Sequence, residues 1–104
     1  RARFNDTPRL GSLLGYVTVQ MVKAMLDRAR STDTDAMLAA LRGLVTETIA
    51  GPVTMRALDQ QSTLGAWVGE TAVEGGRGMM RNWRYEDGAN HMFPEAEVRA
   101  ARRL

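Results

Sequence analysis

Apolar residues recur every three or four positions early in the chain, which is the spacing of one face of an α-helix. The stripe falls between Ser12 and Ala29, where the Ser12 hydroxyl is expected to cap the helix by accepting from a backbone N–H. Because further apolar residues widen the stripe, we expect this helix to be covered on several sides, as in layered folds. The stripe and the residues that widen it are Leu13, Leu14, Tyr16, Val17, Val19, Met21, Val22, Met25 and Ala29.

A second, shorter helix is predicted after the polar run "RSTDTD". Ser31 or Thr32 is expected to cap it, and Asp33 and Asp35 suit the positive end of its dipole. Gly43 lies near its expected end, where a left-handed residue commonly closes a helix. The expected buried face consists of Ala36, Met37, Ala40, Leu41 and Leu44.

Strand-like alternation of apolar and polar residues begins after Gly51-Pro52. Two such segments, Val53–Leu58 and Leu64–Ala72, are separated by the polar stretch 59–63, which lacks the residues of a tight turn. The two segments are therefore not expected to pair with each other. Instead, the Gly-rich stretch 74–78 predicts a hairpin between the second segment and a strand over Met79–Tyr85.

The end of the chain predicts a turn and a short helix. Asp87-Gly88 is a turn signal, and Pro94 can open a helix because its fixed φ suits the first turn. Acidic residues at the start of this helix and basic residues at its end complement the helix dipole. These residues are Glu95, Glu97, Arg99 and Arg102.

Composition indicates a folded chain and excludes several classes of site. The 104 residues, 44% hydrophobic and 25% charged, suit one small domain or part of a larger one. There is no cysteine for a disulfide or thiolate metal site, and the net charge of +2 is interspersed rather than clustered, which disfavours a nucleic-acid interface. The first residues show neither an initiating methionine nor a signal peptide, so we expect the sequence to begin inside a longer protein.

Candidate catalytic chemistry is sparse. His91 is the single histidine and falls in a predicted surface loop, and no multi-histidine metal site is expected. Asp59 has the chemistry of a base, but no nucleophile or second acid stands at a telling spacing, and Ser62 lacks a Gly-x-Ser-x-Gly context. We therefore expect no catalytic residue, no cofactor and no enzymatic activity.

The aromatic residues of the predicted hairpin allow two interpretations. Trp67, Trp83 and Tyr85 could form an aromatic binding face, or they could pack against one another across the strands, which is the commoner use of such spacing.

Three stretches in order resemble one protein family. They are "PRLGSLLGYVTVQMVKAMLDRARSTDTDAMLAALRGL", "TIAGPVTMRALDQQSTLGAWVGET" and "GRGMMRNWRYEDGANHMFPEAEVRA". Together they resemble the C-terminal part of type I periplasmic solute-binding proteins, in the branched-chain amino acid subgroup of ABC-transporter substrate-binding proteins. The resemblance implies a two-lobed α/β protein, outside the cytoplasm, that closes around a small amino acid and delivers it to a membrane permease.

The resemblance also divides the chain. Residues 1–58, two helices and a strand, would belong to the N-terminal lobe, and residues 64–104, a hairpin and a short helix, to the second lobe. Residues 59–63 would cross between the lobes, with Asp59, Gln60 and Gln61 as tentative hinge residues. The subgroup often has histidine where Gln60 stands here, which leaves that residue's part in the hinge or in ligand contact open.

Four residues near the start are tentative ligand contacts by the same resemblance. The loop that leads into the first helix would supply Gly11, Ser12 and Leu13, with Tyr16 just inside the helix. Equally, Ser12 could be a helix cap and Tyr16 a core residue. Two other functions stay open: a ligand-sensing regulatory domain of the same fold, and an autonomous α+β interaction module. If the chain is only part of a binding protein, its apolar surface should make it self-associate.

Overall fold

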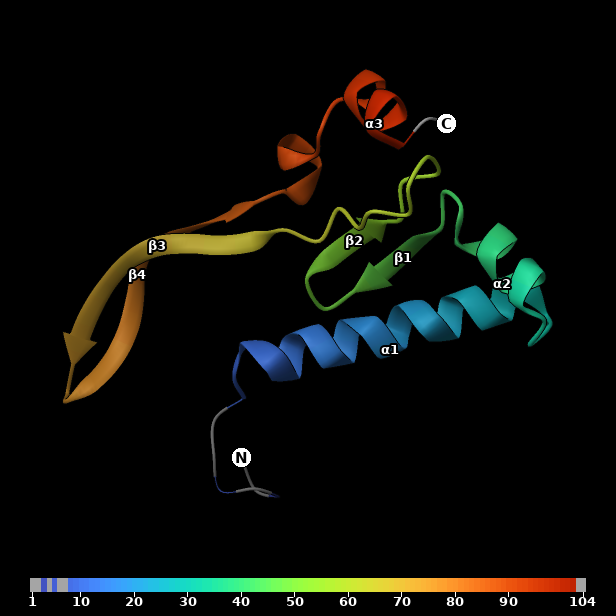
Figure 1. The fold of residues 1–104 in the computed structure, drawn as a ribbon. Helices are drawn as coiled ribbons and strands as arrows, with labels where there is room; N and C mark the ends of the chain where they lie inside the picture. The colour runs from blue at the N-terminus through green and yellow to red at the C-terminus, as the bar shows by residue number, and fades with distance from the viewer. Residues whose placement is uncertain (1–2, 4, 6–7, 103–104) are drawn as a thin grey trace. The chain divides into compact units, whose positions relative to one another are not determined.

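The computed structural model describes residues 3, 5 and 8–102 of the chain (Figure 1). In these residues it has three α-helices and two antiparallel two-stranded sheets, which makes it an α+β protein. The mixture of helices and strands agrees with the expected class, whereas a two-lobed binding-protein fold stays a prediction. Contacts divide the chain into two compact units, Arg1–Gln60 and Gln61–Leu104. Each unit is described by itself below.

The first unit begins with the long helix α1, Leu10–Ala29. The helix starts two residues earlier than expected, and its N-cap is the extended residue Arg9, which makes no side-chain capping bond. Ser12 was thus wrongly expected to be the cap, because it already lies inside the first turn and its backbone N–H donates to the Arg9 carbonyl (2.9 Å). At the other end, left-handed Arg30 donates its N–H to the Leu26 carbonyl.

Helix α2, Thr34–Leu41, is capped by Asp33 rather than by Ser31 or Thr32. The Asp33 carboxylate accepts from the backbone N–H groups of Asp35 and Ala36, both at 3.1 Å. The hydroxyl of Ser31 has a different task and accepts from the N–H of Asp33 (3.0 Å). Gly43 follows the helix with a φ of 65°, which confirms the expected left-handed residue.

A short hairpin of β1, Val45–Thr48, and β2, Gly51–Thr54, completes the first unit. Strand β1 was not predicted, and β2 ends four residues before the expected Leu58. The difference arises because residues 57–59 form a turn instead of continuing the strand. Helix α1 runs along this hairpin and contacts α2 and β1 (Figure 1).

The core of the first unit is small. Among the residues that the structure describes, four hydrophobic side chains are buried: Val17 on α1, Ala40 on α2, Leu44 before β1, and Val53 on β2. Helix α1 is not covered on several sides as expected, because its buried and half-buried positions, among them Val17, Met21 and Met25, form a single stripe. Apolar residues elsewhere on it are exposed, namely Leu10, Leu14, Tyr16, Val19, Val22 and Leu26.

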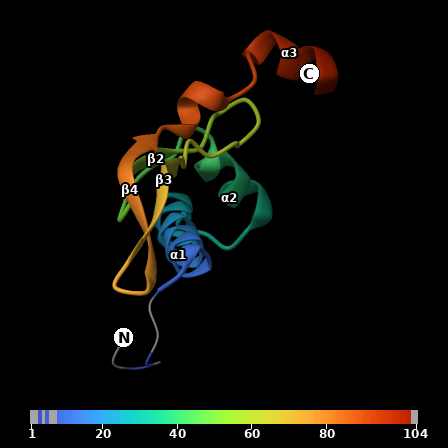
Figure 2. The same cartoon turned by 90° about the vertical axis from the view of Figure 1, so that its left-hand side faces the viewer.

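The second unit is dominated by the predicted hairpin, formed by β3, Ala66–Glu74, and β4, Arg77–Glu86. Strand β3 begins after the expected Leu64 and ends beyond the expected Ala72, whereas β4 extends beyond Met79–Tyr85 at both ends. Left-handed Gly75 and Gly76 make the turn between them. A register shift between Val68 and Glu70 marks a bulge, which is accommodated by left-handed Asn82 on β4. The hairpin is bent along its length (Figure 1), and its strands twist about each other (Figure 2).

The chain ends in two short helices. The 3₁₀-helix η1, Gly88–His91, stands where the turn was expected, and α3, Glu95–Arg102, follows Pro94 with the predicted acidic start and basic end. The segments Val53–Leu58 and Leu64–Ala72 belong to different sheets, since β2 pairs with β1 and β3 with β4. This confirms that the polar stretch at 59–63 is not a hairpin turn between them.

Candidate ligand-contact, hinge and polar sites

The four residues expected to contact a ligand all lie within the first two turns of α1. Gly11, Ser12 and Leu13 were expected in a loop, but the helix includes them, because it starts at Leu10. Gly11, Ser12 and Tyr16 are exposed, and Leu13 is half-buried. Apart from its chain neighbours and the nearby backbone of its own helix, no atom of the described residues lies within 4 Å of the point where a Cβ on Gly11 would stand.

The chemistry of this helix start favours an anion. The first backbone N–H groups of an α-helix lack partners inside the helix, and the helix dipole places partial positive charge there. Arg9 supplies no side-chain cap, and the first turn carries no acidic residue. The N–H groups of Ser12 and Leu13 donate to the Arg9 carbonyl, so the dipole rather than these two donors would attract the carboxylate of a small ligand to this end of α1.

Two of the expected hinge residues, Asp59 and Gln60, belong to a closed turn rather than to an open linker. Arg56 donates from Nε to Oδ1 of Asp59 (2.9 Å) and from Nη2 to Oδ2 (2.5 Å). The Asp59 side chain is only 3% exposed, and that of Arg56 only 14%. Gln60 closes the turn in a left-handed conformation, with φ 58°, and donates its N–H to the Arg56 carbonyl (2.7 Å).

This turn changes the interpretation of Asp59. Both of its carboxylate oxygens accept hydrogen bonds from Arg56, so its geometry is that of a structural ion pair and not of a base facing a substrate. Gln60 and Gln61 follow directly, and the division between the two units falls between them. The sequence does contain a signal for the pair, an arginine and an aspartate three residues apart. The pair was not predicted because Arg56 was expected to lie in a strand rather than in a turn.

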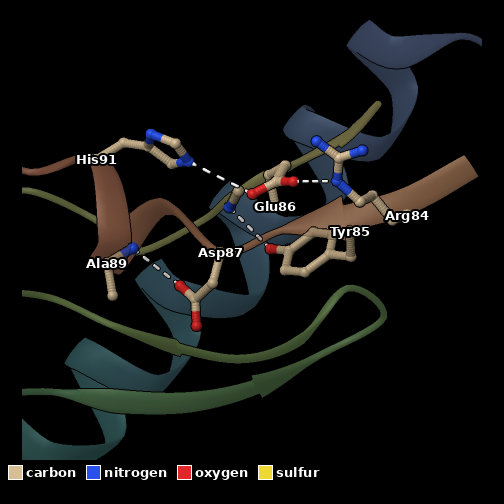
Figure 3. A network of polar contacts seen from close by, with 7 residues as sticks. Arg84, Tyr85, Glu86, Asp87, Ala89 and His91 are labelled. Carbon is tan, nitrogen blue, oxygen red and sulfur yellow. Dashed lines mark hydrogen bonds and ion pairs between the residues drawn. The ribbon is translucent and has the colours of Figure 1, made fainter. Parts of the chain in front are cut away.

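A polar network stands at the base of the β3–β4 hairpin (Figure 3). The Tyr85 hydroxyl accepts from the backbone N–H of Gly65 (2.7 Å), 20 positions earlier in the chain. The Asp87 carboxylate accepts from the N–H of Ala89 (2.8 Å) and so caps η1. His91 is exposed, as expected, and its Nε2 lies 3.6 Å from the Glu86 carboxylate.

Glu86 is the charged centre of that network. Its carboxylate accepts a hydrogen bond from Arg84, and the adjacent guanidinium charge acts in the same direction. These two effects of Arg84, with a smaller contribution from His91, lower the pKa of Glu86 below its ordinary value of 4.5, although desolvation opposes them. Arg84 and, to a smaller extent, His91 thus favour the charged form of the Glu86 carboxylate.

Two glycines allow the chain to pass close to itself beside this network. A Cβ on Gly65 would clash with the backbone carbonyl of Glu86, and a Cβ on Gly88 would lie 2.7 Å from the carbonyl oxygen of Leu64. The segment before β3 and the segment after β4 are therefore in backbone contact. The hydrogen bond from Gly65 to Tyr85 connects the segment before β3 with the end of β4, and no sequence pattern had indicated it.

The hairpin aromatics divide between the two interpretations. Trp67 and Tyr85 are cross-strand partners whose rings meet edge to face, with centroids 5.0 Å apart and an interplanar angle of 60°. This confirms packing across the strands for that pair. Trp83 is different, because it is 62% exposed. A continuous aromatic binding face is therefore not formed by all three.

Across residues 3, 5 and 8–102, no cluster of three or more histidine, cysteine, aspartate or glutamate side chains is placed to hold a metal ion. Within the same residues, no helix is both long and apolar enough to span a membrane. Comparison with protein-family models and with curated proteins gave no match for the chain.

Proposed function

We propose that the chain is the C-terminal part of an extracytoplasmic solute-binding protein that captures a small amino acid for import by an ABC permease. One observation carries the proposal: the chain divides into two compact units at Gln60–Gln61, within the stretch that resembles an inter-lobe crossover. The order of elements is close to the one the resemblance implies: two helices and the strand β2, with the additional strand β1, come before this point, and a hairpin and a short helix come after it.

Two further features support the proposal. The start of α1 has open space beside Gly11 and the positive end of the helix dipole, which suits the carboxylate of an amino acid. Exposed apolar residues on α1, such as Val19 and Leu26, suit a helix that other parts of a longer protein cover. The closed turn Arg56–Gln60 would then keep a fixed backbone conformation before the crossover. The backbone dihedral changes of a hinge motion would occur in the residues that follow it.

Calorimetry on the product of the complete reading frame tests the proposal. We expect one or more amino acids, with branched-chain ones foremost, to bind with a Kd of about 1 µM, or about −8 kcal/mol. A panel of all common amino acids and small amides that produced no binding heat would overturn the function. A signal peptide and neighbouring permease genes would separate it from a regulatory sensor of the same fold.

The ligand-contact residues need their own test. Tyr16→Ala should weaken binding about tenfold if the ring borders the ligand, as for loss of a contact of about 1.4 kcal/mol. Val19→Ala is the matched control, because Val19 is also exposed on α1, at 68% against 55% for Tyr16. Equal affinities for the two variants would remove Tyr16 from the site while leaving the function intact.

A further inference from the structure

Two of the chain's methionines stand apart from the other five. The sequence has seven methionines, and only Met79 and Met80, adjacent on β4, are exposed, at 45% and 46%. The remaining ones, on α1, on α2, after β2 and after η1, are partly buried: Met21, Met25, Met37, Met55 and Met92. Oxidation of methionine follows accessibility of the sulfur, so the exposed pair is where an oxidant will react first.

The two exposed side chains have different surroundings. Successive residues of a strand point to opposite faces of a sheet, and Met79 lies opposite Ala72 while Met80 lies opposite Thr71. The Cγ of Met80 lies 2.7 Å from the point where a Cβ on Gly69 would stand. Met80 therefore fills the space that Gly69 leaves above the backbone, at the bulge of the hairpin.

We propose that Met79 and Met80 are an oxidant-sensitive modification site that takes an oxygen atom from a peroxide, and that the sulfoxide at Met80 loosens the hairpin. The thioether sulfur attacks one peroxide oxygen, an S–O bond forms and the O–O bond breaks. The sulfur loses two electrons, the transferred oxygen gives up its proton, and the second oxygen takes up a proton and leaves as water from hydrogen peroxide or as an alcohol from an alkyl hydroperoxide. A thiol-dependent methionine sulfoxide reductase reverses the change.

The effect on the hairpin follows from the position of Met80. A sulfoxide is polar, so it is less favourable in the space over Gly69, which the backbone carbonyl oxygen of Arg81 also borders. Two acceptors repel at such a place, and the oxidised side chain turns toward water. The Met80 side chain then no longer packs over Gly69 at the bulge between Val68 and Glu70, whereas oxidation of Met79 leaves that packing unchanged.

Limited oxidation of the chain with hydrogen peroxide, followed by trypsin digestion and mass spectrometry, tests the first half of the proposal. Cleavage after Arg77 and Arg81 releases residues 78–81 as one peptide that holds both methionines. This peptide should gain oxygen earlier than the peptides carrying Met21, Met25 and Met37. Simultaneous oxidation of all of them would overturn the assignment.

Two matched variants test the second half. Met79→Leu leaves a sulfoxide only at Met80, and Met80→Leu leaves one only at Met79, and both changes conserve volume. After oxidation, amide hydrogen exchange around Gly69 should accelerate in Met79→Leu and stay unchanged in Met80→Leu, and the reductase should restore the first. Equal exchange in the two oxidised variants would show that Met80 has no special role and would overturn the proposal.

Discussion

Two threonines on strand β1 differ in whether their hydroxyl groups form hydrogen bonds. Thr48 donates to the Gly51 carbonyl (2.8 Å) and accepts from the Ala50 N–H (3.1 Å), and so closes the turn between β1 and β2. Thr46 is buried at 8% exposure, and its hydroxyl has no partner among the described residues, as is also true of the Gln20 side-chain oxygen. A buried polar group without a hydrogen bond costs stability.

Replacing Thr46 should therefore help the fold. We expect Thr46→Val to raise the free energy of unfolding by about 1 kcal/mol, because it removes an unpaired hydroxyl and keeps the β-branched shape. Thr48→Val is the matched control and should lower it by about 1 kcal/mol, since it deletes two hydrogen bonds. Urea unfolding of both variants measures this, and equal losses in both would contradict the assignment for Thr46.

The buried ion pair of the closed turn should be sensitive to loss of one partner. Asp59→Asn leaves the Arg56 charge buried beside a neutral amide, and we expect it to cost about 3 kcal/mol. The comparison is Asp27→Asn on α1, where the pair with Lys23 is 64% and 76% exposed, and where less than about 1 kcal/mol is expected. Chemical denaturation measures the free energy of unfolding of both variants. Similar decreases in the two would mean that the burial of Asp59 does not strengthen its ion pair.

At the scale of elements, the helices and the long hairpin followed from the sequence, whereas the short hairpin did not. The long hairpin had alternating strands and a Gly75-Gly76 turn, which is a strong local signal. The β1–β2 turn contains Ile49 and Ala50 in place of such a signal, and it depends on Thr48 and on Gly51 at φ 99°. Side-chain closure of a turn leaves little trace in a pattern of apolar positions.

The close approach of Gly65 and Gly88 makes a sharp prediction for the hairpin element. Gly65→Ala should cost about 2–3 kcal/mol, because its methyl group meets the backbone carbonyl of Glu86, which cannot easily move. Gly78→Ala on β4 is the control, since nothing lies within 4 Å of the added carbon there. Hydrogen exchange of β3 and β4 amides is the measurement, and protection retained in Gly65→Ala would refute the contact.

The base of the hairpin should also respond to acid. Because the folded chain lowers the pKa of Glu86, folding favours its charged form. This stabilisation is fully present above the ordinary value of 4.5 and is lost as the pH falls through the lowered pKa.

Two substitutions separate the partners in this acid response. Glu86→Gln should remove its share of the loss of stability in acid, and Arg84→Gln should move the Glu86 titration back up toward 4.5. Carboxyl NMR shifts across the titration, with urea unfolding at each pH, provide both readouts. A Glu86 titration that is unchanged by Arg84→Gln would exclude Arg84 as the cause.

For the whole molecule, the candidate site could be predicted only as a list of residues. The resemblance named Gly11, Ser12 and Leu13 as a loop, but helix α1 includes them because it begins at Leu10, after the extended residue Arg9. It named Asp59 as a hinge, yet the ion pair with Arg56 depends on where the strand ends, which local alternation does not encode. Long-range contacts such as Gly65 to Tyr85 are invisible to periodicity.

The exposed apolar side of α1 predicts how the isolated chain behaves. Val19, Val22 and Leu26 recur at helical spacing and are 68%, 45% and 36% exposed, so the chain should self-associate in solution. Val19→Lys with Val22→Glu should reduce the association, while Met79→Lys on the hairpin should not, if α1 is the surface responsible. Sedimentation velocity over a range of concentrations measures this, and a monomer at all concentrations would refute it.

The placement of the aromatic rings has an optical consequence. Both tryptophans of the chain, Trp67 and Trp83, belong to the β3–β4 hairpin, so tryptophan emission reports on the second unit alone. Far-ultraviolet circular dichroism is weighted toward helix, and the longest helix, α1, lies in the first unit. In one unfolding experiment, tryptophan emission therefore reports on the second unit, while circular dichroism is weighted toward the first. If the two transitions coincide, the two units unfold as one cooperative system. If they separate, the units on either side of the turn at Arg56–Gln60 unfold independently.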